Sequence, residues 1–151
     1  MSRAFVKEDD DAIEDLPDRP VSTAPNLVTA EGLAAIDAEI ARLDAELAAA
    51  GDDRADRARI ARDLRYWTAR RSTAQLVPPP ADHSVVRFGC TVTVERDDAR
   101  SHAYRIVGED EAAPENGTIS HVSPLARSLM GKEVGDSVRV AEHEFEIVEI
   151  A

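Results

Sequence analysis

The chain has 151 residues, with 30 aspartate and glutamate residues against 18 lysine and arginine residues, a formal net charge of −12 and a pI near 4.7. Stable binding of nucleic acid draws its affinity from clustered cations, so this acidic chain is not expected to bind DNA or RNA directly by itself. Only 4% of the residues are aromatic, whereas 43% are hydrophobic. The expected core is therefore aliphatic, and a base-stacking surface is disfavoured.

Cysteine and histidine usage excludes two further classes of site. Cys90 is the only cysteine, which excludes an internal disulfide and a cysteine-rich zinc site. The four histidines, His83, His102, His121 and His143, lack the spacing of metal ligands on a helix, so no metal site is expected. No apolar run approaches the roughly 20 residues that span a bilayer, and we expect a soluble, cytoplasmic protein without a membrane partner.

Residues 1–25 are acidic and contain three prolines without hydrophobic periodicity, which is typical of a mobile tail. Residues 26–77 predict a helical hairpin. In the first helix, apolar residues recur at spacings of three and four; they are Leu33, Ile36, Ile40, Leu43 and Leu47. Thr29 suits the N-cap position of this helix, and Gly51 suits the position at which the helix ends. The apolar period resumes after the GDDRAD segment, which predicts the second helix.

The charges support pairing of the two helices as an antiparallel coiled coil. Residues 29–53 carry seven acids and one base, whereas residues 54–77 carry seven bases and two acids, so the helices attract along their flanks. The residues alone also allow a simpler interpretation, in which the hairpin is a dimerisation or packing element.

Prolines within residues 78–82 predict a stiff linker, and residues 83–151 read as a β-rich domain. Alternation of apolar and polar residues predicts a strand over 86–94, and further short strands are expected at 104–107, 118–122, 137–140 and 145–150. Ser123 followed by Pro124 marks the start of one short helix. The fold class is therefore α+β, a helical hairpin followed by an antiparallel β-sheet domain.

Three carboxylates gather at the predicted hairpin tip, about residues 51–56. These are Asp52, Asp53 and Asp56. Carboxylate oxygens suit Mg²⁺, but so few ligands would hold it only weakly unless a partner completes the site. The alternative is that aspartate is simply a favoured turn and N-cap residue.

The sheet domain carries, in chain order, the motifs VRFGCTVTV, YRIVGEDEA, ISHVSPLARSLMGKEVGD and FEIVEI. Together these motifs resemble the bacterial Gre transcript-cleavage factors. The second helix, RDLRYWTARRSTAQLV, is similar to the GreB branch, and the opening MSRAFVKEDDD is similar to N-terminal extensions of some GreB-like proteins.

The resemblance implies an FKBP-like C-terminal domain that docks on RNA polymerase and a coiled coil that enters its secondary channel. Acidic tip residues then help to hold the second Mg²⁺ of the polymerase active centre, so that the polymerase itself cuts backtracked RNA. The chain is accordingly expected to be a monomeric factor, not an enzyme, with no cofactor of its own.

Two features of the tip depart from the family pattern. Gly51 and Asp52 match it, but the position of the family glutamate falls on Ala55, and Asp53 and Asp56 are the expected substitutes. Each helical arm is also shorter than the usual Gre arm by about ten residues, or about 15 Å at 1.5 Å per residue.

Two segments match family regions at or near the polymerase contact. The expected contact residues are Glu109, Asp110, Glu111, Ser123, Pro124 and Leu125. For Pro124 and Leu125 the alternative is that they only start and pack the short helix.

The expected function is that of an elongation factor at the secondary channel, with stimulation of RNA cleavage through the tip. One alternative is a short-armed, non-cleaving regulator similar to the Rnk type, which competes for the same entrance. Another is a hairpin dimer or adaptor unrelated to transcription.

Overall fold

The computed structural model describes residues 16–151, in two compact units that are considered separately. The hairpin unit contains the described residues up to Thr23 together with Ala34–Ala74. The sheet unit contains Ala24–Leu33 and Gln75–Ala151. The opening MSRAFVKEDDD, and with it most of the expected tail, lies outside the described residues.

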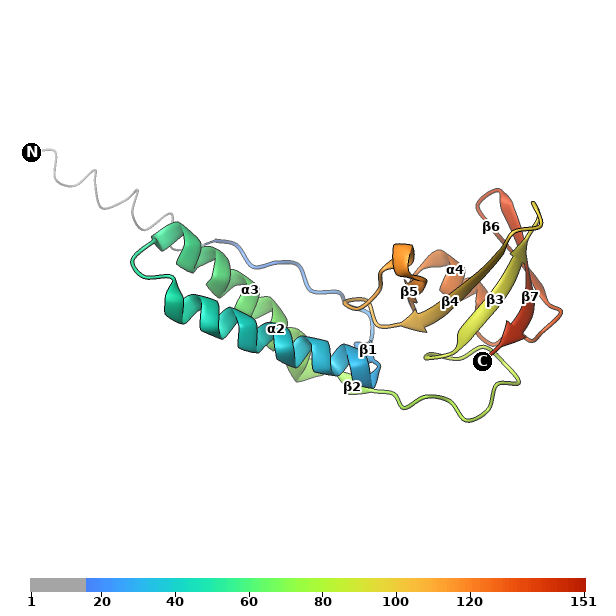
Figure 1. Cartoon of the computed structure of the whole chain (residues 1–151), viewed down its shortest axis with the longest axis horizontal. Coiled ribbons are helices and arrows are strands. Elements are labelled where there is room, and N and C mark those ends of the chain that lie inside the picture. The colour runs from blue at the N-terminus through green and yellow to red at the C-terminus, as the bar shows by residue number, and fades with distance from the viewer. Residues whose placement is uncertain (1–15) are drawn as a thin grey trace, which may run out of the picture. The chain divides into compact units, whose positions relative to one another are not determined.

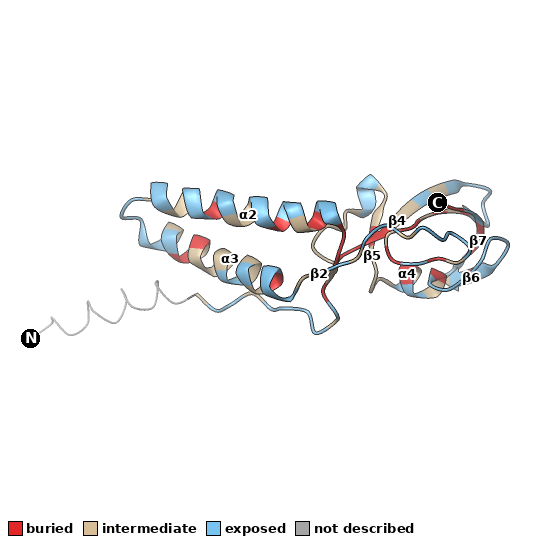
Figure 2. Ribbon diagram, turned by 90° about the horizontal axis from the view of Figure 1, so that it is seen from below, coloured by how far each residue is buried: buried red, intermediate tan, exposed pale blue. Residues whose placement is uncertain are grey.

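Two helices of equal length form the hairpin, α2 (Ala30–Ala49) and α3 (Arg54–Thr73) (Figure 1). Each has 20 residues and is therefore about 30 Å long. Ile36, Leu43 and Ile60 are buried, and buried positions of α2 lie on its side toward α3 (Figure 2). The apolar spacing of three and four residues thus placed the helices and their contact face correctly.

Ion pairs join the acidic helix to the basic one. Arg59 of α3 contacts Glu46 of α2 at 2.6 Å, and Arg71 contacts Asp37 at 2.7 Å. These pairs are partly exposed and contribute little free energy individually. Their geometry nevertheless confirms the flank attraction that the charge distribution predicts.

Residues 16–23 lie along α3 and are part of the hairpin unit, in contrast to the mobile tail expected over 1–25 (Figure 1). The Arg19 guanidinium lies 3.9 Å from the centre of the Tyr66 ring and 3.4 Å from an Asp63 carboxylate oxygen. Arg65 donates to the carbonyl of Leu16 at 3.1 Å and pairs with Asp18. Cation–π attraction and charge pairing therefore hold a segment that has no hydrophobic periodicity.

The boundary between hairpin and sheet domain also differs from the expected one at residue 77. Strands β1 (Leu27–Val28) and β2 (Gln75–Leu76) pair in parallel, and Leu27 and Val77 pack against the core of the sheet unit. The chain segments that lead into and out of the hairpin thus belong to the sheet unit.

The main sheet has five strands in the order β5-β4-β3-β7-β6. Their bounds are β3 (Thr91–Arg96), β4 (Ser101–Val107), β5 (Thr118–Ser120), β6 (Ser137–Val140) and β7 (His143–Ile150). A 3₁₀ turn, η1 (Pro114–Asn116), precedes β5, and one short helix, α4 (Pro124–Leu129), follows it. The predicted α+β class, a hairpin followed by a sheet domain with one short helix, is confirmed.

Two details of the sheet correct the sequence prediction. The sheet is mixed rather than antiparallel, because β5 pairs with β4 in parallel after a connection that includes η1. The first strand begins at Thr91 rather than at residue 86, because Gly89 has a φ of +88° and the amide of Cys90 turns back to the carbonyl of Arg87. The alternation of apolar and polar residues continues through this turn as an alternation in burial, since Phe88 and Cys90 are buried.

The core of the sheet unit is mainly aliphatic, as the composition predicts. Residues of β3, β4, β7 and α4 share one cluster, and its members without exposed surface are Cys90, Val92, Val94, Ile106, Ala126, Leu129 and Ile147. Within residues 16–151, no helix combines the length and the apolar character that crossing a bilayer requires.

Two sheet turns place alanine in the left-handed region, and they generate a stability prediction. Ala141, between β6 and β7, has a φ of +56°. This conformation costs an L-residue about 1–2 kcal/mol, whereas glycine adopts it freely. Ala141→Gly should raise the free energy of unfolding by about 0.5–1 kcal/mol after the entropy of the unfolded chain is counted, measured by urea denaturation.

The matched control is Ala103→Gly, which places glycine at an exposed position inside β4. This variant should be less stable than the parent by about 0.5–1 kcal/mol. A denaturation midpoint for Ala141→Gly at or below that of the parent would contradict the prediction.

Candidate functional site

The hairpin turn is built by a left-handed glycine and an aspartate cap. Gly51 has a φ of +61°, and the carboxylate of Asp53 accepts a hydrogen bond of 3.1 Å from the amide of Asp56. Asp53 is therefore the N-cap of α3. Arg57 reaches back to the carbonyl of Gly51 at 3.2 Å, which ties α3 to the turn.

Asp56 is engaged in an ion pair on its own helix. Its carboxylate lies 2.8 Å from Arg59, which also contacts Glu46 across the hairpin at 2.6 Å. Hydrogen bonds from the guanidinium to Asp56 and then to Glu46 raise the pKa of Arg59 above its ordinary value. Asp56 is thus held within the hairpin by an internal cation.

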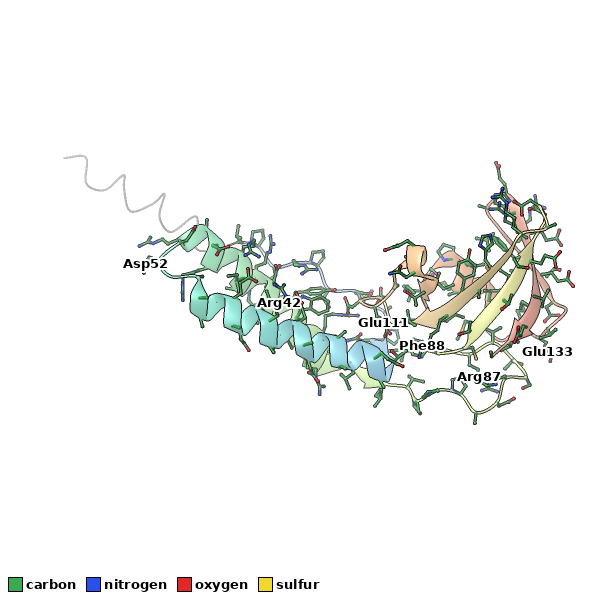
Figure 3. The ribbon with its side chains drawn as sticks, in the orientation of Figure 1. Arg42, Asp52, Arg87, Phe88, Glu111 and Glu133 are labelled. Carbon is green, nitrogen blue, oxygen red and sulfur yellow. The ribbon has the colours of Figure 1, made fainter. Side chains whose placement is uncertain are left out.

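Asp52 is the tip carboxylate for which the described structure records no hydrogen bond or ion pair, and it is exposed at the turn between α2 and α3 (Figure 3). It lines a depression of about 760 Å³ together with Arg54 and Arg57. The described residues contain no group of three or more His, Cys, Asp or Glu side chains arranged to hold a metal ion. The turn can therefore offer one free carboxylate, the equivalent of one or two oxygen ligands, to a metal site that a partner completes.

The loop after β4 holds the first group of predicted contact residues. Glu109 and Asp110 are partly buried and take part in further interactions. Glu111 accepts a hydrogen bond of 2.6 Å from the hydroxyl of Thr29 and longer ones from the amides of Thr29 and Gly108, at 3.2 and 3.4 Å. Its carboxylate is therefore directed at the start of α2 (Figure 3).

The second predicted group lies at the start of α4 and has structural roles in two of its three members. The Ser123 hydroxyl accepts a hydrogen bond of 3.3 Å from the amide of Ala126 and is the N-cap. Leu125 is half-buried and packs against the core of the sheet unit. Pro124, the first residue of the helix, is exposed and is the member of this group best placed to meet a partner.

The link between Thr29 and Glu111 was missed by reasoning from the sequence. Thr29 is the N-cap that was predicted, because its hydroxyl accepts from the amide of Gly32 at 3.0 Å. Its second partner lies 82 residues away, beyond any local pattern. The available signal was Gly32 itself, since glycine inside a first helical turn costs about 1 kcal/mol and suggests a close approach by another group.

Comparison with known proteins finds relatives of about half of the chain. Residues 81–151 match the family described as "Transcription elongation factor, GreA/GreB, C-term". A transcription elongation factor GreA from Alkalilimnicola ehrlichii is 46% identical over 86 residues, which cover 52% of this chain and 54% of that protein. Another GreA, from Paracoccus denitrificans, is 44% identical over 70 residues, 46% of this chain and 45% of that protein. The chain spans about half the length of the curated relatives it matches.

Two solved structures are also similar to the chain, at lower identity. The GreA factor homolog 1 (Gfh1) of Thermus thermophilus is 19% identical with a TM-score of 0.42, and covers 85% of this chain and 99% of its own. A GreA/GreB factor of Nitrosomonas europaea is 20% identical with a TM-score of 0.42, covering 82% of this chain and 97% of its own. The YRIVGEDEA and SPLARSLMGK motifs lie inside the region, residues 81–151, that matches this family.

Proposed function

We propose that the whole chain is a transcription elongation factor that binds RNA polymerase and acts through its secondary channel. The observation that carries the proposal is that a region matching the GreA/GreB C-terminal family follows a helical hairpin whose turn presents an exposed carboxylate. A domain of this family supplies the docking surface, and the hairpin supplies a narrow element that can enter a channel.

In the proposed mechanism Asp52 adds an oxygen ligand to the Mg²⁺ site of the polymerase active centre, and the polymerase cuts backtracked RNA. A single carboxylate binds Mg²⁺ weakly, so the polymerase must supply the remaining ligands. The chain is then a factor and not a free-standing nuclease, and it needs no cofactor of its own. Asp53 and Asp56, which were expected to share the role, support the turn instead through the cap and the ion pair with Arg59.

The second candidate function is that of a short-armed regulator that occupies the same entrance without stimulating cleavage. Two observations favour it. The helices have 20 residues each, about 30 Å, and only one of the three tip carboxylates is free of an internal contact in the described structure. A factor with this function binds the polymerase but does not stimulate cleavage of backtracked RNA.

The docking surface and the branch of the family remain part of the proposal. We assign the polymerase contact to exposed Pro124 with its neighbours Ser123 and Leu125, and to Glu109 and Asp110 in the loop after β4. The second helix resembles the GreB branch, whereas the matching relatives are named GreA, so membership of the GreB branch stays a prediction.

The direct test is cleavage of a backtracked elongation complex by core polymerase with the parent protein and with Asp52→Asn. Loss of the tip carboxylate should slow factor-dependent cleavage by roughly 10- to 100-fold, the range found when a supporting group of a metal site is removed. Binding to the polymerase, measured by co-migration, should not change.

Asp44→Asn is the matched control, because Asp44 is exposed on α2 and its substitution makes the same change in net charge. It should cleave like the parent. Equal cleavage by both variants would remove Asp52 from the mechanism, and binding without cleavage by the parent would support the second candidate. Failure of the parent to bind core polymerase would reject both.

Asp53 should affect stability rather than chemistry. Asp53→Ala removes the N-cap of α3 and should lower the free energy of unfolding by about 1 kcal/mol, whereas Asp53→Asn keeps a capping oxygen and should change it little. Urea denaturation of the two variants measures the difference. A large loss of cleavage in Asp53→Asn with unchanged stability would instead return Asp53 to the group of metal ligands.

A further inference from the structure

One arginine of α3 holds the main chain of the hairpin turn. The Nη1 atom of Arg57 donates to the carbonyl of Gly51 at 3.2 Å and, at the longer distance of 3.5 Å, to the carbonyl of Leu47. All three residues belong to the hairpin unit. The contact therefore ties the start of α3 to the end of α2 and to the turn between the two helices.

The end of α2 gains from this cation because the helix does not provide one itself. Within Ala30–Ala49, the last helical turn contains no basic side chain. The last four carbonyls of a helix lack intrahelical partners and lie at the negative end of its dipole, so a nearby basic side chain stabilises them. Leu47 offers one of these carbonyls to Arg57. Helix α3 thus supplies the cation that the end of α2 lacks.

A second arginine of α3 reaches the same turn of α2. Arg59 contacts the carboxylate of Glu46, the residue before Leu47, at 2.6 Å. The recorded bonds of Arg59 go to side chains, those of Glu46 and Asp56, whereas the recorded bonds of Arg57 go to main-chain carbonyls. We call Arg57 with the carbonyls of Leu47 and Gly51 the turn clamp.

The carbonyl of Gly51 matters for Asp52 because it belongs to the peptide group that joins these two residues. A peptide group is planar from one Cα atom to the next, so a hydrogen bond to its oxygen also restrains the Cα atom of Asp52. Gly51 by itself gives this point wide freedom. Its φ of +61° lies in a region that glycine enters without cost, and a Cβ added there would meet no atom within 4 Å.

The turn clamp leaves the carboxylate of Asp52 available. Arg57 and Asp52 line the same depression, yet the recorded hydrogen bonds of the guanidinium go to carbonyls. A carboxylate that completes a metal site needs a fixed backbone as well as unoccupied oxygens, since a displacement of about 1 Å can lower a rate by about 100-fold. The clamp provides the first without consuming the second.

We propose that Arg57 is a positioning residue for Asp52. It holds the Gly51–Asp52 peptide so that the tip carboxylate is presented in one orientation, and it touches neither the metal nor the RNA. This role rests on the proposed function, because the orientation of Asp52 affects cleavage only where its carboxylate takes part in the reaction.

Backbone dynamics of the full chain test the turn clamp without polymerase. In ¹⁵N relaxation measurements, the amide of Asp52 should have an order parameter near the rigid value of about 0.85 in the parent and below about 0.6 in Arg57→Ala. The matched control is Arg71→Ala, which removes the same side chain and charge from α3 together with a contact to Asp37 of α2. This control lies about 21 Å further along the helix and should leave the order parameter of Asp52 unchanged. Equal order parameters in the parent and Arg57→Ala would overturn the proposal.

A double-mutant cycle in the cleavage assay tests whether Arg57 acts through Asp52. Arg57→Ala alone should slow factor-dependent cleavage by about 10-fold, the lower end of the range for a group that supports a metal ligand, with unchanged affinity for core polymerase. In an Asp52→Asn background the same substitution should have almost no further effect, because the carboxylate that it positions is gone. A general loss of hairpin structure would slow cleavage equally in both backgrounds, and that result would overturn the proposal.

The two measurements separate this role from the proposed function. Loss of cleavage in Arg57→Ala with an unchanged order parameter would mean that Arg57 acts on the reactants directly, which overturns the positioning role and leaves the proposed function standing. If the parent stimulates no cleavage, the proposed mechanism fails and the positioning role fails with it. The relaxation data then still decide whether the turn clamp orders the tip.

Discussion

The carboxylate of Glu111 joins the loop after β4 to Thr29, the N-cap of α2, within the sheet unit. Glu111 satisfies a hydroxyl and two amides that would otherwise face solvent or lack a partner. Because helix N-termini always leave amides without intrahelical partners, a side chain from elsewhere in the chain can capture the helix through them. The fold uses this general property to join parts of the sequence that lie 82 residues apart.

Part of the acidity of the chain comes from carboxylates that have structural contacts. Many of the carboxylates are engaged by arginines or by backbone amides, as with Asp56 and Arg59 in the hairpin and Asp53 at the turn. Such contacts offset the negative charge of the carboxylates locally and create no cationic surface. A low pI is thus compatible with a role in transcription, provided that the protein meets the polymerase rather than the nucleic acid.

Much of the fold follows from local patterns. The apolar spacing from Leu33 to Leu47 placed α2, and Thr29 and the Ser123–Pro124 pair marked two helix starts correctly, because caps depend on neighbours within three residues. The parallel pairing of β5 with β4 was not predicted, because strand direction depends on the path of the connection and not on the alternation of residues. The turn at Gly89 was missed for a related reason, since the buried positions alternate through it.

The candidate site was predictable in place but not in detail. The acidic turn from Gly51 to Asp56 lies at the end of the hairpin as expected. Which aspartate caps α3 and which forms an ion pair depends on the amide of Asp56 and on Arg59, and composition does not reveal these contacts. Glu111 shows the same limit more strongly. A family motif suggests that the residue matters, and only the distances to Thr29 indicate which contact it makes.

The segment from Leu16 to Thr23 has a consequence for steric fit. With Arg19 on the Tyr66 ring and Arg65 bonded to Leu16, the hairpin unit is three chain segments thick along this part of α3. The segment therefore adds to the width of the helix pair. A passage that admits this part of the protein intact must be wider than one fitted to two helices alone.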